Sequence, residues 1–312
     1  MNMMTQLTVS DAHLSDWDTR ASVRTQAVRK LDTKEGYPFS PDLVPYLGHA
    51  LVRERGEQVK REILAHKFYD FSRFTVELET IAVVPVSLSI GRNELPFEFS
   101  TEAALGGLKI AVDEAHHALQ ASLTLSEMVE AIGVMPLAHK PEHRFFTTLR
   151  HQKHDRSTRE KALLDLQAVC VSETLITGAL RKVPTDNQVM RTVREVTLDH
   201  ARDEAKHHAY YSEVVREFWY KLSVAEQDFF GPKFAKWIAA FIDPDPVTQA
   251  HWLIACGFET QIAIQIVNET LEDLNSVQLR KNSAKPTISL LKRYGILDHA
   301  ATADSLHEAG LI

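Results

Sequence analysis

Ionisable side chains stand at the centre of an apolar helical stripe in this chain, and this placement constrains the fold more than any other feature. Along residues 187–222 the positions that recur every three or four residues are mostly apolar, but His200, Glu204 and His207 occupy the middle. A stripe with this period is the face that an amphipathic helix buries. The sequence therefore predicts an acid and two imidazoles inside a helical core.

Two further stretches show the same pattern. Along residues 101–132 the centre of the apolar stripe is held by Glu114 and His117, and along residues 158–182 it is held by Glu173. A weaker stripe along residues 67–90 has Glu79 at its centre. Acidic side chains from four separate helices are thus predicted to enter one core.

The acid of the weakest stripe has a competitor two positions earlier, Glu77. A step of four residues from Thr75 reaches Glu79, whereas Glu77 falls off the stripe. We therefore favour Glu79 and keep Glu77 as the alternative.

Four carboxylates buried together need compensating positive charge, because each buried ion costs several kcal/mol and like charges repel. Two divalent cations balance four negative charges, and histidines add none when they bind as neutral imidazoles. Dinuclear sites in four-helix bundles take one Glu from each of two helices and a Glu-x-x-His from each of the other two. The candidate metal ligands follow this order, with one extra histidine: Glu79, Glu114, His117, Glu173, His200, Glu204 and His207. Oxygen and imidazole ligands suit iron or manganese.

An aspartate precedes each Glu-x-x-His unit. Neighbouring residues on a helix point about 100° apart, so each aspartate is directed toward another helix. There it can accept the N–H of a ligand histidine. We predict that Asp113 pairs with His207 and that Asp203 pairs with His117.

The remaining reactive side chains near these motifs have simpler interpretations. Cys170 is predicted to be a small core residue, and His116 and His208 are predicted to face the flanks of their helices. Tyr211 follows His207 on the same stripe. It is interpreted as a packed residue with a satisfied hydroxyl, the alternative being a radical or pocket residue.

The fold class predicted is all-α. Residues 1–40 are interpreted as a polar arm, either poorly ordered or wrapped over the surface, and residues 41–312 as a single helical-bundle domain. The long loop 133–157 is interpreted as a solvated connector, with a lid or partner surface as the alternative. Helices are predicted at about 42–66, 67–90, 101–132, 158–182, 187–222, 226–242, 246–273 and 284–294.

Composition and net charge argue against several classes of protein. The net charge of −7 argues against nucleic-acid binding, which needs clustered Lys and Arg. No run of about 18 uninterrupted apolar residues predicts a membrane span, and the start has no secretory apolar core. Two cysteines are too few for a disulfide framework, so we expect a reducing, cytoplasmic location.

The motif His200-x-x-x-Glu204-x-x-His207, with Glu173 upstream and Asp113-Glu114-x-x-His117 before it, resembles the diiron N-oxygenases of the p-aminobenzoate N-oxygenase type. The resemblance implies a ferritin-like bundle with extra helices at both ends and a dinuclear site in its four-helix core. It also implies that all seven candidate ligands bind iron, with manganese a weaker alternative.

The same resemblance implies that the protein activates O2 and converts an amine to a hydroxylamine, nitroso or nitro product, in natural-product biosynthesis and as a homodimer. No Gly-x-Gly nucleotide fingerprint occurs, so electrons are expected from an external donor, either a reductase or ferredoxin or a small reductant. Phe71, Phe74 and Thr177 lie about one turn from Glu79 or Glu173 and are candidate pocket walls.

Three other readings stay open at this point. Iron storage with ferroxidase activity uses similar ligand pairs, and so does a radical-generating subunit like the small subunit of ribonucleotide reductase, with Tyr211 or Tyr210 as the radical. The third reading is a helical bundle without metal, which would have to bury four glutamates without compensating positive charge. The sequence leaves open which amine is used (aryl or alkyl, free or carrier-bound), how far it is oxidised, and whether carbon is oxidised instead.

Overall fold

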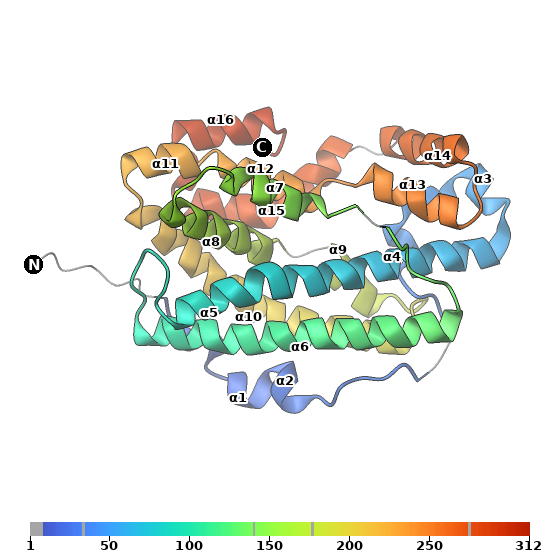
Figure 1. Ribbon diagram of the computed structural model, residues 1–312, viewed down its shortest axis with the longest axis horizontal. Helices are drawn as coiled ribbons and strands as arrows, with labels where there is room; N and C mark the ends of the chain where they lie inside the picture. Colours follow the sequence, from blue (N-terminus) through green and yellow to red (C-terminus); the bar gives the residue numbers. More distant parts are fainter. Residues whose placement is uncertain (1–8, 33–34, 140, 176–177, 274–275) are drawn as a thin grey trace, which may run out of the picture.

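Regular secondary structure in the computed structural model is helical throughout the residues it describes, which are 9–32, 35–139, 141–175, 178–273 and 276–312 (Figure 1). The one extended pairing among them is an isolated bridge between Tyr37 and Val189. The predicted all-α class is confirmed.

Four long helical runs form the central bundle. The first comprises α4 (Gly56–Leu78), the π-helical segment η4 (Glu79–Val83) and α5 (Val84–Gly91). The others are α6 (Thr101–Ile132), α8 (Thr158–Thr174) and α10 (Arg191–Lys221). Helices α4 and α5 pack along α6, and α10 packs on both α6 and α8 (Figure 1). The arrangement is that of a ferritin-like bundle.

The predicted boundary between residues 66 and 67 is wrong, because one helical run continues from Gly56 to Gly91. Its irregularity comes later, where the N–H of Val84 donates to the carbonyl of Glu79, five residues back. Pro85 lacks the N–H that a regular helix would donate to Ile81, so the ladder is already interrupted there. The π segment therefore begins at Glu79, one of the predicted ligands.

Helix α6 has the bounds that its sequence predicts. The side chain of Ser100 caps its start by accepting from the N–H of Ala103, and Gly133 ends it with a left-handed φ of 75°. At α8, Ser157 and Glu160 form a complete capping box. Local sequence therefore sets both ends of α6 and the start of α8.

Prolines and glycines divide several predicted helices into shorter ones. The predicted helix 42–66 begins instead with η2 (Pro41–Leu43), η3 (Pro45–Gly48) and α3 (Ala50–Arg53). Gly231-Pro232 separates α11 (Val224–Phe230) from α12 (Lys233–Ile242), and Gly257, at φ 83°, lies between α13 (Pro246–Ala255) and α14 (Thr260–Asp273). Helix 158–182 breaks after Thr174 and continues as α9 (Gly178–Lys182) and η5 (Val183–Thr185).

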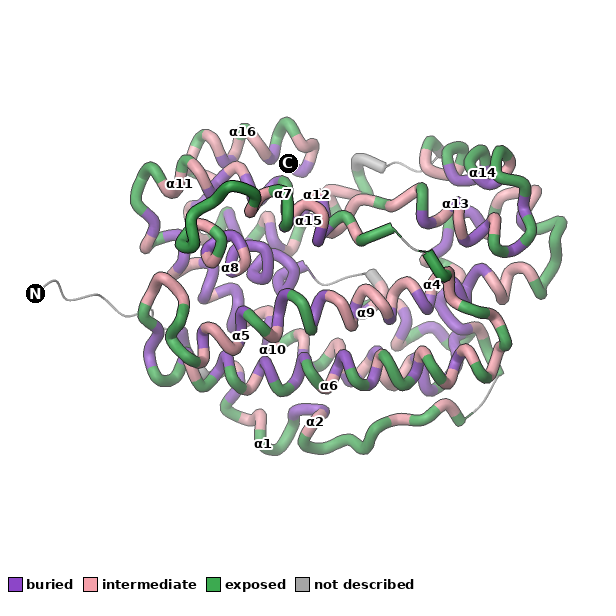
Figure 2. The backbone as a smooth tube through the Cα atoms, in the orientation of Figure 1, coloured by how far each residue is buried: buried purple, intermediate pink, exposed green. Residues whose placement is uncertain are grey.

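The C-terminal end holds more helix than predicted. Helix α15 (Ser276–Arg293) is longer than the predicted 284–294, and η6 (Ile296–Asp298) and α16 (Ala300–Glu308) follow it. Helix α12 packs on α8, α7 and α16. The C-terminal helices thereby help to bury α8, most of which is buried from Leu163 onward (Figure 2).

The loop predicted over residues 133–157 contains a helix, α7 (Arg144–Lys153). Its apolar residues Phe145, Phe146 and Leu149 are buried in the core. The reading as a solvated connector is therefore wrong for this part, because three apolar residues on one face suffice to anchor a helix whose other face is charged.

The described part of the N-terminal arm wraps over the bundle. It forms η1 (Asp11–Leu14), α1 (Trp17–Arg20) and α2 (Ser22–Thr25), which lie against α6 and α10 (Figure 1). The division of the chain at residue 40 stays a prediction.

Two stretches, Gly56–Gly91 and Thr158–Thr185 (the second spans the break after Thr174), are long and apolar enough to cross a membrane by length and composition alone. Both belong to the central bundle, and the second is mostly buried inside it. Core helices of soluble proteins have the same length and composition, so the molecule resembles a soluble protein.

Candidate metal centre

All seven predicted ligands come from the four central runs and lie in the interior. Glu79 begins the π segment, Glu173 is the last residue but one of α8, and the others lie on α6 and α10. Five are buried, and the side chains of His200 and Glu204 are 12% exposed. The helical period thus places every one of these side chains where the sequence predicts.

Six of these residues form two groups that could each hold a metal ion. One group comprises Glu114, His117, His200 and Glu204, and the other comprises Glu114, Glu173, Glu204 and His207. Within each group the candidate ligand atoms lie within 4.8 Å of one another. The two groups share both glutamates that belong to Glu-x-x-His units.

Glu114 directs one carboxylate oxygen toward each group. Its Oε2 lies 2.9 Å from Nδ1 of His117, and its Oε1 lies 2.8 Å from Nδ1 of His207. Oε1 of Glu204 lies 3.1 Å from Nε2 of His200, 3.5 Å from Nδ1 of His207 and 3.7 Å from Nδ1 of His117. Each of these two carboxylates therefore reaches histidines of both groups.

Glu79 lies at the edge of the first group, with its Oε1 3.9 Å from Nε2 of His200. Glu77, by contrast, lines a separate hollow on the outside of the bundle together with Arg73 and Arg150. The structure therefore directs Glu79 toward the cluster and Glu77 away from it. Glu173 completes the second group, with its Oε2 3.9 Å from Nδ1 of His207.

Several atoms of the cluster are buried without a hydrogen-bond partner among the described residues. They are Oε2 of Glu79, Oε1 of Glu114, Oε2 of Glu173 and Nδ1 of His207. Although Nδ1 of His207 lies 2.8 Å from Oε1 of Glu114, the contact lacks the alignment of a hydrogen bond. Buried unpaired lone pairs that converge are costly, and divalent cations satisfy them. The residues present therefore fit a pair of metal ions.

The pKa values of the buried glutamates depart far from those of exposed carboxyl groups. Burial and the neighbouring carboxylates raise the pKa of Glu79 and of Glu173 well above its usual range. Burial alone would raise the pKa of Glu114 too, but His207 and His117 hold it well below normal.

The histidines show the converse effect. Burial alone would lower the pKa of His117, but Glu114 and Asp203 raise it to about 10. The pKa of His207 is raised in the same way by Glu114 and Asp113. Without metal, the cluster therefore compensates part of its negative charge by holding protons.

The hydrogen bonds predicted between the two halves of the bundle are present. Nε2–H of His207 donates to Asp113 at 3.1 Å, and Nε2–H of His117 donates to Asp203 at 3.2 Å. All four side chains are buried. These bonds leave Nδ1 of each imidazole facing the cluster, which is the tautomer that a metal ligand needs.

The N-terminal arm holds both aspartates, a feature that sequence reasoning missed. The indole N–H of Trp17 lies 2.9 Å from both carboxylate oxygens of Asp113. The backbone N–H of Ser22 lies 3.2 Å from Asp203, and its hydroxyl also donates to that carboxylate. These contacts join residues 96 and 181 positions apart in the chain. Helical periodicity therefore could not predict them. The one sequence signal for them is a tryptophan in an otherwise polar arm.

The flanking residues have local partners. The hydroxyl of Tyr211 is fully buried and lies 2.7 Å from the hydroxyl of Ser87, which matches the packed reading. Tyr210 donates to the carbonyl of Ala103 at 2.6 Å. Cys170 is buried in the core.

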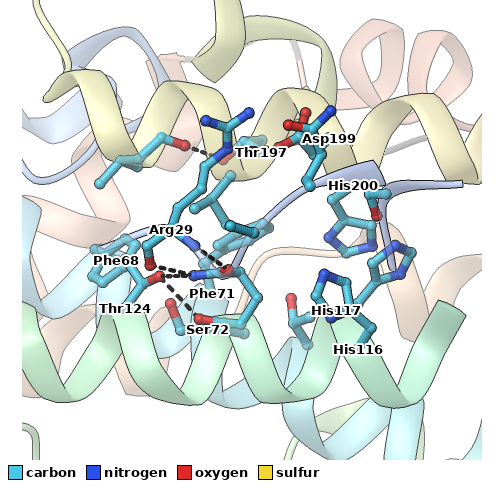
Figure 3. Close-up of a pocket in the computed structure, with 18 residues that line it drawn as sticks. Arg29, Phe68, Phe71, Ser72, His116, His117, Thr124, Thr197, Asp199 and His200 are labelled. Carbon is cyan, nitrogen blue, oxygen red and sulfur yellow. Dashed lines mark hydrogen bonds and ion pairs between the residues drawn. The ribbon is translucent and has the colours of Figure 1, made fainter. Parts of the chain in front are cut away.

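Two cavities border the cluster from different sides. The arm-side cavity lies between the N-terminal arm, α4, α6 and α10, and His117 and His200 form part of its wall (Figure 3). The inner cavity, of about 70 Å³, is bordered by Glu79, Glu173, His200 and Glu204. Its remaining walls are two hydroxyl residues, Thr75 and Ser172, and six apolar ones: Phe71, Phe74, Leu78, Leu175, Leu180 and Phe241.

Of the three predicted pocket residues, Phe71 and Phe74 line the inner cavity. Thr177 lies outside the described residues. His116, predicted to face the flank of its helix, lines the arm-side cavity beside His117 (Figure 3). His208 is partly buried, and this burial lowers its pKa.

We expect Trp17→Phe to weaken binding of divalent iron by about 10- to 100-fold, the usual effect of removing an outer partner of a ligand histidine. The phenyl ring keeps an aromatic side chain at this position but lacks the N–H that holds Asp113. Anaerobic titration of the full chain measures the affinity. Thr25→Ala, on the same arm and bonded only to Ala21, is the control. Equal affinities in wild type and Trp17→Phe would show that the arm does not orient His207.

One comparison with known proteins bears on this geometry. The family described as p-aminobenzoate N-oxygenase AurF matches residues 16–295, nearly the whole chain. The matched range begins in the arm just before Trp17 and contains all seven predicted ligands. The chain belongs to the p-aminobenzoate N-oxygenase family, a family of non-haem diiron oxygenases that use O2.

Proposed function

We propose that this chain is a diiron N-oxygenase whose seven buried acids and histidines hold both iron ions and which converts an amine to its hydroxylamine, nitroso or nitro product. The observation that carries this proposal is the pair of Glu/His groups that share Glu114 and Glu204. Two ions with two common carboxylates are the arrangement by which carboxylate-rich bundles hold a dinuclear site.

The charges support two ions rather than one. Glu79, Glu114, Glu173 and Glu204 carry −4 when ionised, and two ferrous ions carry +4. In this assignment His117, His200 and Glu79 belong to one ion and His207 and Glu173 to the other, with Glu114 and Glu204 common to both. When bound, the iron pair would supply the electrons that reduce O2.

The protein's own residues have two tasks in this proposal. Asp113 and Asp203 keep His207 and His117 in the tautomer that presents a lone pair to the centre. The apolar walls of the inner cavity exclude water and leave room for the amine beside Glu79, Glu173 and His200. The inner cavity would thus place the amine nitrogen next to the residues that would hold the iron pair.

The electron donor, the biosynthetic role and the cellular location belong to the same proposal. A reductase, a ferredoxin or a small reductant would supply the external electrons, and the product would serve natural-product biosynthesis in the cytoplasm. The match to an N-oxygenase family over most of the chain supports this reading over ferroxidase activity and over a stored tyrosyl radical.

An exposed apolar seam on α6 supports a homodimer. Leu105, Leu108, Val112, Leu119 and Leu123 are between 38% and 50% exposed. Three of them recur at intervals of seven residues, the spacing that keeps side chains on one seam between two packed helices. We propose that the α6 helix of a second copy covers this seam.

Anaerobic reconstitution with Fe(II), followed by O2 and an arylamine, tests the function directly. We expect two iron ions per chain and an N-oxygenated product by mass spectrometry. Glu79→Gln should lower turnover by about 100-fold or more, because it removes a ligand. Glu77→Gln is the matched control and should leave iron content and turnover unchanged. If Glu77→Gln proved the damaging variant, or if iron stayed below two per chain, the ligand assignment would be wrong.

Iron loading should release protons, and its apparent affinity should rise with pH. Without metal, burial and neighbouring carboxylates raise the pKa of Glu79 and Glu173, and the carboxylates around the imidazoles raise the pKa of His207 and, to about 10, that of His117, so metal binding must displace protons from the cluster. The ions bind deprotonated ligands, so lower pH favours the metal-free state. Calorimetry in buffers of different ionisation enthalpy counts the protons. A pH-independent affinity between about pH 6 and 8 would contradict the pKa shifts.

The dimer has its own test. The double variant Leu105→Glu/Leu123→Glu places charges at both ends of the seam and should sediment as a monomer, because a buried unpaired charge disrupts an interface. Leu279→Glu, an exposed apolar residue of α15 away from the seam, is the control. A wild-type monomer at micromolar concentration would refute the dimer.

A further inference from the structure

The inner cavity contains no cationic side chain among its described wall residues. Apart from the proposed ligands, its walls are six apolar side chains and the hydroxyls of Thr75 and Ser172. We propose that the substrate is a small apolar amine that carries no carboxylate or other anionic group. This inference rests on the proposed function and specifies the substrate of that same site.

The charge around the inner cavity is negative before the metal is counted. Glu79, Glu173 and Glu204 all border it. The two ions would neutralise the four carboxylates of the cluster, so no positive charge is left over for a substrate anion. A carboxylate transferred there would be buried without a partner, which costs several kcal/mol.

The arginine that lines the arm-side cavity is already paired with two carboxylates. Arg29 lines the arm-side cavity, where its guanidinium lies 2.6 Å from Asp199 and 2.9 Å from Glu195. Figure 3 shows it away from His117 and His200, next to Asp199 and Thr124. A substrate anion would have to displace two protein carboxylates to reach it. The arm-side cavity therefore offers no anion site either.

Phenyl rings separate the inner cavity from the surface. Phe71, Phe74 and Phe241 line both the inner cavity and a larger outer chamber of about 300 Å³. The rings of Phe74 and Phe241 are 5.6 Å apart, and the ring of His143 lies 3.9 Å from that of Phe74. A substrate entering from this side passes between aromatic rings, which favour an apolar skeleton.

The outer chamber also disfavours an anion. Its single lysine, Lys67, lies over the ring of Trp252 at 5.4 Å, and the acids Asp70, Asp243 and Asp245 line the same chamber. Asp243 is itself paired with Arg144 and Arg280, so neither guanidinium is left for a substrate. Together with Lys67 these two arginines only balance the three acids, so the described chamber has no surplus positive charge to attract a free carboxylate.

The family is described by a substrate, p-aminobenzoate, that carries a carboxylate. Its methyl ester has the same ring and amine but no charge, so the two compounds form a matched pair. We expect the iron-loaded full chain, held anaerobically, to bind the ester about 100-fold more tightly than the acid in calorimetry. Equal binding, tighter binding of the acid, or no measurable binding of the ester would overturn the inference.

A variant that adds the missing charge sharpens the test. Phe74→Arg places a guanidinium on the wall shared by the two chambers and should improve p-aminobenzoate binding by at least about 10-fold. Phe74→Met removes the ring without adding charge and should not improve it. If Phe74→Arg fails to fold, the wild-type comparison of acid and ester still decides the question.

The same samples separate the two proposals when O2 is admitted. If the ester binds but neither compound is N-oxygenated, the proposed function fails and the substrate inference stands. If the acid is both bound and oxygenated better than the ester, the function stands and the substrate inference fails.

Discussion

Buried carboxylates that must be neutralised determine how this molecule is built. Glu114 and Glu204 come from facing helices and would repel each other in a dry core unless cations lay between them. The nearest opposite charges that the chain itself offers are imidazolium groups, and the raised pKa of His117 and His207 shows the protein using them. Bound metal ions would replace those protons, so the same cluster would serve as a folding constraint and as a reaction centre.

The cluster has two similar halves, and in each half the single glutamate lies beside irregular backbone. Each half supplies a single glutamate, a Glu-x-x-His unit and an aspartate that crosses to the other half. Both single glutamates lie where a regular helix fails: Glu79 opens the π segment, and Glu173 precedes the break after Thr174. Irregular turns of this kind are frequent at functional sites. His200 has no counterpart in the first half, so the two ion positions differ in their imidazoles.

Sequence periodicity predicts the parts of this structure that depend on one helix at a time. It places every candidate ligand in the core and predicts the bounds of α6 and the pairing of each aspartate, because those follow from which face of a helix is buried. It fails where a helix break depends on one or a few residues, and where a contact joins segments that are far apart in the chain. The breaks at Gly231 and Gly257 depend on single residues, α7 has too few apolar positions to register, and the bonds from Trp17 and Ser22 join segments far apart in the chain.

The proposed chemistry also constrains the protonation of the substrate. Forming an N–O bond uses the nitrogen lone pair, so the amine must enter as its free base. An alkyl amine resembles lysine, with a pKa near 10.4, and its deprotonation at pH 7 costs about 4.6 kcal/mol. A cluster whose carboxylates are neutralised by two ions has no net negative charge to stabilise the ammonium form, and apolar walls disfavour it, so the inner cavity would not recover that cost by binding it. An arylamine is already a free base at pH 7 and avoids the cost. The absence of a cation among the described wall residues and the neutrality of a metal-loaded cluster therefore favour the same substrate: an uncharged aromatic amine.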